Sequence, residues 1–87
     1  MDNLITIDDK NRPLIIKKIG IIFQTSETRE ISFDTPFLNK CLGVIAQQSN
    51  NTTPYSTYDC VVVDKSKFRV IVNTTMSVNT VFLAFGY

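Results

Sequence analysis

Few side chains of this chain could do chemistry, and none of them is arranged as a catalytic group. There is no histidine among the 87 residues, so the most common general base is missing. Two carboxylate pairs, Asp8-Asp9 and Glu27/Glu30, have the residue type with which glycosidases flank a glycosidic bond. Asp8 and Asp9 lead into a polar interval, where aspartates commonly bond to the local backbone of a turn. We therefore expect no catalytic residues, and no enzyme.

The two cysteines, Cys41 and Cys60, offer thiol chemistry only if their surroundings activate them. Lys40 adjoins Cys41, but neighbouring residues of a strand point to opposite faces, so the cation would not lower the thiol pKa. Both cysteines have apolar neighbours, which favours buried free thiols. One internal disulfide is the alternative. Two cysteines without histidine do not complete a zinc site, and we expect no metal and no cofactor.

Two uncharged polar intervals could bind a ligand. Gln47 to Thr57 is long and amide-rich with nearby tyrosines, and Asn73 to Asn79 is shorter. Amides that bond to hydroxyls and aromatic faces that pack on sugar rings would suit carbohydrate, whereas the alternative is a solvated loop. The Asn-x-Thr matches in both intervals are interpreted as chance, because no secretory signal precedes them. The candidate binding residues are Asn50, Asn51, Tyr55, Tyr58, Asn73 and Asn79.

The elements that would position these residues are short β-strands. The apolar stretches are rich in Ile, Val, Phe and Tyr, polar clusters separate them, and none has a helical period. This pattern predicts a small antiparallel β-sandwich, with a bulge or kink at Gly20 within one long strand. The predicted strands are Leu4 to Ile7, Leu14 to Ile19, Ile21 to Gln24, Arg29 to Phe33, Cys41 to Gln47, Tyr58 to Val63, Phe68 to Val72 and Thr80 to Phe85.

Alternation indicates which strands have a solvated face. Phe68, Val70 and Val72 share one side of their strand, and Ile31 and Phe33 share one side of theirs. The last strand differs, because it is apolar on both sides and must be covered twice. So short a chain has little material for a second cover, which predicts contact with another copy. The candidate interface residues are Val81, Phe82, Phe85 and Tyr87.

Composition limits the other partners. A net charge of +1, with charges spread along the chain, provides no basic stripe for nucleic acid. The longest apolar runs, Ile19 to Phe23 and Val81 to Phe85, are far shorter than the roughly 20 residues of a membrane span, so no membrane insertion is expected. The start lacks the features of a secretory signal, which predicts a chain made in the cytoplasm or cut from a longer protein. With disulfide and metal disfavoured, oligomerisation is the expected stabiliser of so small a domain.

The order of several motifs resembles the C-terminal (gp53-like) domain of bacteriophage and prophage tail fibre proteins. Gly20 to Gln24 is similar to that family's Gly-Leu-Ile-Ile-Gln, and the segment Ile31 to Phe37 to its Phe-Pro-x-x-Phe. Ser66 to Val70 is similar to its Gly-Phe strand start, and the end Val81 to Tyr87 resembles Trp-x-Ala-Ile-Gly-Tyr. Thr25-Ser26, Asp34 and Phe82 depart from the family's Trp-Gly, Pro and Trp, respectively.

The length of 87 residues predicts a single domain. The resemblance covers residues 12–87 and implies that they form a fibre-tip β-sandwich, with residues 1–11 as a strand and turn that lead from a possible fibre shaft. It implies a homotrimer at the tip of a virion tail fibre, made in the bacterial host's cytoplasm and attaching to a host surface receptor, a polysaccharide or a protein. Two alternatives stay open. The domain could be a structural trimerisation cap without receptor contact, or a free-standing small interaction or inhibitor protein.

Overall fold

The protein consists of β-strands in two antiparallel sheets. The structure, a computed structural model, describes residues 2–7, 13–49 and 56–87. The strands are β1 (Asp2–Ile7), β2 (Pro13–Phe23), β3 (Glu27–Ser32), β4 (Cys41–Gln48), β5 (Ser56–Asp64), β6 (Lys67–Thr74) and β7 (Val78–Gly86). The predicted all-β class is confirmed, and so is the one long strand through Gly20, which is β2.

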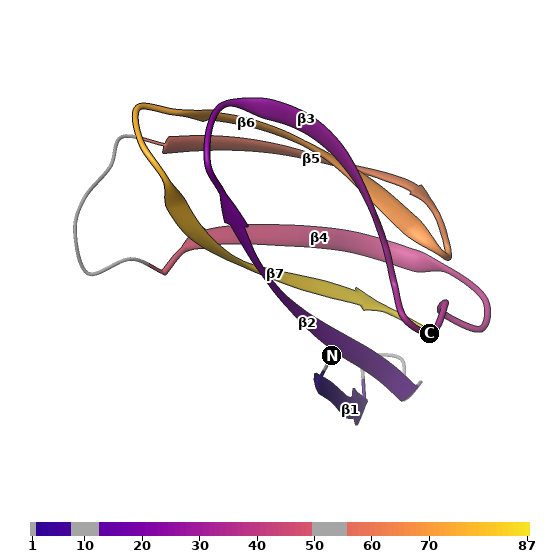
Figure 1. Cartoon of the computed structure of the whole chain (residues 1–87). Helices are drawn as coiled ribbons and strands as arrows, with labels where there is room; N and C mark the ends of the chain where they lie inside the picture. Colours follow the sequence, from indigo (N-terminus) through magenta and orange to yellow (C-terminus); the bar gives the residue numbers. More distant parts are fainter. Residues whose placement is uncertain (1, 8–12, 50–55) are drawn as a thin grey trace.

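The sheets stack as two layers, of four and three strands (Figure 1). One sheet has the order β1-β2-β7-β4 and the other β3-β6-β5. The last strand, β7, therefore lies inside the larger sheet, with β2 on one side and β4 on the other. The side chains that face each other between the layers form one core.

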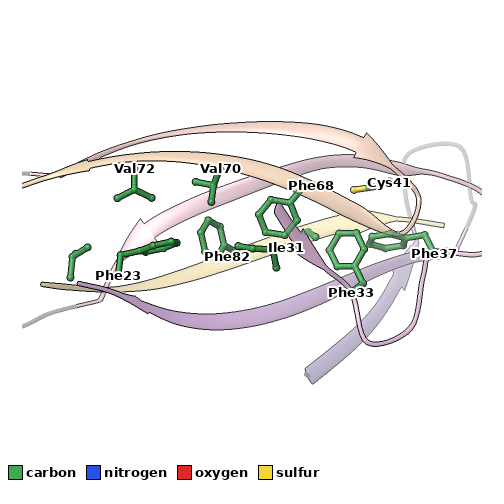
Figure 2. Packing of buried hydrophobic residues seen from close by; sticks show 11 residues of the cluster. Phe23, Ile31, Phe33, Phe37, Cys41, Phe68, Val70, Val72 and Phe82 are labelled. Carbon is green, nitrogen blue, oxygen red and sulfur yellow. The ribbon is translucent and has the colours of Figure 1, made fainter. Parts of the chain in front are cut away.

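Aromatic side chains fill that core, as Figure 2 shows. Phe68 of β6 lies at the centre, with its ring centroid 5.1 Å from Phe82 and 5.7 Å from Phe33. The predicted alternation is confirmed, since every second residue of β6 is buried. The fully formed cluster contains Phe23, Ile31, Phe33, Phe37, Cys41, Phe68, Val70, Val72, Val78, Phe82 and Ala84.

The two sides of β7 have different surroundings. Phe82 is 0% exposed, because the second sheet covers the inner side of β7. The prediction that Phe82 contacts another copy of the chain is therefore wrong. Val81, Leu83 and Phe85 point outward and keep some exposure. Together with outward residues of the neighbouring strands they form what we call the apolar face: Ile16, Ile22, Ile45, Val81, Leu83 and Phe85.

The bulges lie elsewhere than the sequence predicted. Strand β2 pairs with β7 without a register shift through Gly20, so the predicted bulge there is wrong. A shift occurs instead between Cys41 and Gly43 of β4. Gly43 lies opposite Phe85, and a Cβ on Gly43 would come within 2.6 Å of that ring. The phenyl group therefore lies over the glycine and covers its backbone.

The end of β7 is fixed by the segment that precedes β4. The Tyr87 N–H donates to the Lys40 carbonyl at 3.0 Å, and the Asn39 and Lys40 N–H groups donate to the Tyr87 carbonyl at 2.8 and 2.9 Å. Gly86 allows this approach, since a Cβ there would collide with the Lys40 carbonyl oxygen. A glycine at position 86 is thus needed for the backbone to pass this closely.

Candidate functional site

Two connections lie at one end of the sandwich, at the left of Figure 1. They are the β2–β3 turn at residues 24–26 and the β6–β7 loop at residues 75–77, and strand β4 ends and strand β5 begins at the same end. We call twelve described residues of these connections and of the adjoining strand ends the uncharged end, because none of the twelve is charged: Gln24, Thr25, Ser26, Ser49, Ser56, Thr57, Asn73, Thr74, Thr75, Met76, Ser77 and Asn79. Glu27, the first residue of β3, directly follows Ser26, is charged and pairs with Arg29.

Thr74 holds the uncharged end together. Its N–H donates to Ser26 Oγ at 2.9 Å, and its carbonyl accepts from the same hydroxyl at 3.2 Å. Its own hydroxyl accepts from Ser56 Oγ at 3.0 Å and donates to the Met76 carbonyl at 2.6 Å. One threonine thus joins segments that are 48 residues apart in the chain. These bonds fix the backbone of the turns beneath the exposed side chains.

The exposed part of this end is neutral, hydrogen-bonding and partly apolar. Gln24, Thr25, Thr57 and Asn73 are exposed, and Met76 is 56% exposed. Amide and hydroxyl groups can both donate and accept, so the surface can match hydroxyl groups in either sense. A ligand bound to these residues would meet hydrogen-bonding groups and one thioether, with the ion pair of Glu27 and Arg29 beside the β2–β3 turn.

The predicted binding residues lie in different parts of the structure. Asn73 and Asn79 are exposed, as the prediction required. Asn50, Asn51 and Tyr55 lie outside the described residues.

Tyr58 is not a residue of the exposed loops, and this prediction is wrong. Its hydroxyl lies 2.8 Å from Thr80 Oγ1 of the other sheet, and its ring centroid lies 6.5 Å from that of Phe82. Thr80 is only 1% exposed, so this hydrogen bond crosses the buried interior. Tyr58 therefore joins the two sheets.

The turn Gln24-Thr25-Ser26 completes the uncharged end, and the sequence reasoning missed it. Its signal was present, because three uncharged polar residues separate the apolar run before Phe23 from the next strand. Its place in the site depends on the tertiary structure, because Ser26 of the turn is hydrogen-bonded to Thr74 at the end of β6.

The interface candidates are divided between surface and core. Val81 and Phe85 belong to the apolar face, and Phe82 belongs to the core. Tyr87 is half-buried at the opposite end of the sandwich, beside Lys40.

The groups that could have done chemistry are held apart. Glu27 points inward and pairs with Arg29, at 2.8 Å between Oε1 and Nη2, and the guanidinium lies 5.0 Å from the Phe23 ring centroid. Glu30 points outward to Lys67, at 3.2 Å, so Glu27 and Glu30 do not form a carboxylate pair. The ion pair of Arg29 and Glu27 instead closes the flank between β3 and β2.

Cys41 and Cys60 are free thiols. Burial raises the pKa of both thiols, and the negative charge of Asp59 raises that of Cys60 further. A raised pKa keeps the sulfur protonated and weakly nucleophilic at neutral pH. The predicted free thiols are confirmed, and the predicted burial holds for Cys41, whereas Cys60 is half-buried.

Two negative findings apply to residues 2–7, 13–49 and 56–87 only. No group of three or more His, Cys, Asp or Glu side chains in these ranges could hold a metal ion. These ranges also contain no helix that is long and apolar enough to cross a bilayer.

The opposite end of the sandwich is charged. Asp34, Lys40, Asp64 and Lys65 lie in or beside its connections. Asp64 accepts hydrogen bonds from the hydroxyl and N–H of Ser66 and from the Lys67 N–H, and these bonds lower the pKa of its carboxyl group. The molecule thus has two chemically different ends.

Comparison with known proteins gives one family and one group of structures. Residues 14–87 match the family described as putative tail fiber protein gp53-like, C-terminal. The C-terminal part of the P. aeruginosa R2 pyocin fiber superposes with a TM-score of 0.75 at 17% identity, over all of this chain and 26% of that one. An N-truncated R1-type pyocin tail fiber gives a TM-score of 0.71 at 15% identity, over all of this chain and 87% of that one.

At these identities the structural likeness shows the fold. The chain spans 26% and 38% of the two R2 pyocin fiber chains that it matches. No curated protein sequence matches the chain significantly.

Proposed function

The chain belongs to the gp53-like C-terminal family of tail fibre proteins, and we propose that it forms the receptor-attaching tip of a phage- or pyocin-type fibre. In this proposal three copies form the tip, and each presents its uncharged end to the surface of the host cell. The module binds and does not catalyse. Its place is on the virion, at the far end of the fibre.

The observation that carries the proposal is the uncharged end itself. Exposed hydroxyl and amide groups stand there on a backbone that Thr74 and Ser26 hold in place. Binding side chains on fixed turns need little ordering when they meet a ligand. Bacterial surface polysaccharides present many hydroxyl groups, and neutral donors and acceptors match them without desolvating a charge.

Repetition would strengthen a weak contact. Each copy contributes the same small surface, and linked copies gain affinity through a high effective concentration. Overall avidity can then exceed the affinity of one site by about 10²–10⁴-fold, provided that all copies engage the surface together.

The test uses the labelled chain, a panel of bacterial cells and an array of purified bacterial polysaccharides. The variants Thr25→Glu and Met76→Glu place an unpaired carboxylate on the uncharged end, and each should lower binding by roughly 10-fold or more. Thr35→Glu is the matched control, because Thr35 is also exposed but lies at the charged end. Its binding should equal that of the wild type. Binding unchanged by both Thr25→Glu and Met76→Glu would remove the uncharged end from the proposal.

A second candidate function is a structural cap that holds the fibre's copies together. The apolar face favours it, since Ile22, Ile45 and Leu83 are 56%, 59% and 40% exposed in the single chain. Deletion of the domain would then give misassembled fibres, while changes at the uncharged end would leave both assembly and adsorption unaltered.

A further inference from the structure

An ion pair lies at the inner side of the β2–β3 turn, beside the uncharged end. Phe23 directly precedes the turn at residues 24–26, and Glu27 directly follows it. The Arg29 guanidinium lies over the Phe23 ring, 5.0 Å from its centroid. It donates from Nε and Nη2 to the two carboxylate oxygens of Glu27, at 3.3 and 2.8 Å. A ring face and two hydrogen bonds thus fix the orientation of the guanidinium.

The outer side of this ion pair is open to solvent. The side chains of Arg29 and Glu27 are 41% and 29% exposed, although Phe23 beneath them is 0% exposed. Strand β3 is the edge of its sheet, and β1 pairs with β2 as far as Lys18. Among the described strands, none is hydrogen-bonded to β3 or to residues 19–23 of β2 on this flank. A ligand at the β2–β3 turn can therefore reach the pair from the flank.

The guanidinium keeps hydrogen-bond donors for such a ligand. It has five N–H groups in a fixed fork, and the Nε–H and one Nη2–H are used on Glu27. Because stacking and pairing already hold the Arg29 side chain, little further freedom is lost when a ligand accepts hydrogen bonds from it. The oxygens of Glu27 also keep lone pairs that can accept from a hydroxyl group.

The opposite charges of the pair determine which ligand groups it favours. Glu27 cancels the charge of Arg29, so the pair attracts an anion less than an isolated arginine would. A carboxylate or phosphate of a ligand would meet the Glu27 carboxylate beside the donors that it needs, and such like-charge contacts select against a ligand. An uncharged hydroxyl group has no such penalty, because it can donate to the carboxylate and accept from the guanidinium.

We infer that the Glu27–Arg29 pair is a specificity-determining part of the receptor site, and that it selects neutral polysaccharides over those with carboxylate or phosphate groups. Arg29 supplies donors, and Glu27 supplies an acceptor and repels anions. This inference rests on the proposed function, because it concerns the ligand that is bound at the uncharged end. It extends the receptor site from the β2–β3 turn onto the flank of β3.

The experiment compares two glutamate substitutions on the same strand. Glu27→Gln removes the carboxylate of the pair at nearly constant shape, and Glu30→Gln is its matched control. Glu30 is also in an ion pair, with Lys67 at 3.2 Å, but it lies on the outer side of β3. Both substitutions change the net charge by the same amount. Binding is measured on the array of purified bacterial polysaccharides, sorted into neutral members and members that carry carboxylate or phosphate.

The measured quantity is the ratio of the dissociation constants for acidic and neutral polysaccharides. The wild type and Glu30→Gln should prefer the neutral members by the same ratio. Glu27→Gln should lower this ratio about 10-fold, because acidic members bind more tightly once the neighbouring carboxylate is gone. The change should shrink as the salt concentration rises from about 0.1 to 1 M, since exposed charges are screened. A pair with a structural role alone would lower the melting temperature and leave the ratio unchanged.

A second variant decides the question if Glu27→Gln does not fold, which circular dichroism and thermal melting report. Arg29→Lys keeps the positive charge but has no planar fork, so the affinity for neutral polysaccharides should fall about 10-fold. Arg69→Lys is its control, because Arg69 is exposed on the outer side of β6. Its affinity should equal that of the wild type.

The two proposals fail in different measurements. A wild type that binds polysaccharides with a ratio unchanged by Glu27→Gln overturns the role of the pair and leaves the receptor role standing. A wild type that prefers acidic polysaccharides has the same meaning. A wild type that binds neither cells nor polysaccharides contradicts both the receptor role and the inference that rests on it.

Discussion

Replacement of Tyr58 by Phe tests whether this tyrosine joins the two sheets. The substitution keeps the ring that packs at the edge of Phe82 and removes only the hydroxyl that lies 2.8 Å from Thr80 Oγ1. Because Thr80 is 1% exposed, its own hydroxyl would be left in the core without the tyrosine partner. The perturbation is therefore a single hydrogen bond across the interior.

The expected loss follows from the burial of Thr80. Leaving a buried hydroxyl unsatisfied costs about 1–3 kcal/mol of the free energy of unfolding. Thr80→Val alone should cost less, because the hydroxyl of the half-buried Tyr58 can turn toward water. The double variant Tyr58→Phe/Thr80→Val removes both partners at nearly constant shape, and the two losses should fail to add by about 1 kcal/mol.

Urea unfolding at one fixed protomer concentration measures these differences. With a slope of about 1 kcal/mol per M for so small a chain, Tyr58→Phe should lower the unfolding midpoint by about 1 M or more. Binding to cells should stay unchanged, because the hydroxyl faces the core. A midpoint equal to that of the wild type, or losses that simply add in the double variant, would refute the role of Tyr58 between the sheets. Lost binding in a fully stable variant would restore it as a contact residue.

Two further predictions concern the glycines and one carboxylate. Gly86→Ala should destabilise the fold by about 1–3 kcal/mol, because its Cβ would meet the Lys40 backbone. Gly20→Ala places its Cβ in open space, so it should be neutral or stabilise the fold by a few tenths of a kcal/mol. Urea unfolding midpoints compare the two variants, and equal effects would contradict the close approach at Gly86. Asp64→Asn should be less stable than the wild type above about pH 4, and the difference in stability should shrink as the pH falls below the usual carboxyl pKa of 3.8. The reason is that a carboxyl group with a lowered pKa adds stability only while it is ionised. Thermal melting from neutral to acid pH measures this difference, and a difference that stays constant would contradict the prediction.

The strands were predictable where alternation was unambiguous. In β6 one side carries Phe68, Val70 and Val72, whereas the other side includes the polar residues Arg69 and Asn73, so the buried side could be identified from the sequence. The sheet order could not, because the position of β7 between β2 and β4 depends on pairing between distant segments. Gly20 suggested a bulge, but a glycine within an uninterrupted ladder has the same local sequence signal.

Errors at the site arose where both sides of a strand are apolar. Cys60, Val61, Val62 and Val63 are all apolar, so the sequence does not show which side of β5 faces inward, and Tyr58 was predicted as a loop residue because it adjoins the polar interval. The same ambiguity in β7 placed Phe82 at the surface. Composition predicted the polar intervals, but it could not predict that they lie at one end of the sandwich, because this depends on the strand topology.

The position of β7 has a consequence for how tightly its outward residues could be held by a neighbour. Hydrogen bonds on both flanks fix its backbone over nearly its whole length. Leu83 and Phe85 therefore stand on a segment whose main-chain entropy was lost when the chain folded. Little additional freedom disappears when such a segment is covered, and a modest area can then suffice for tight association.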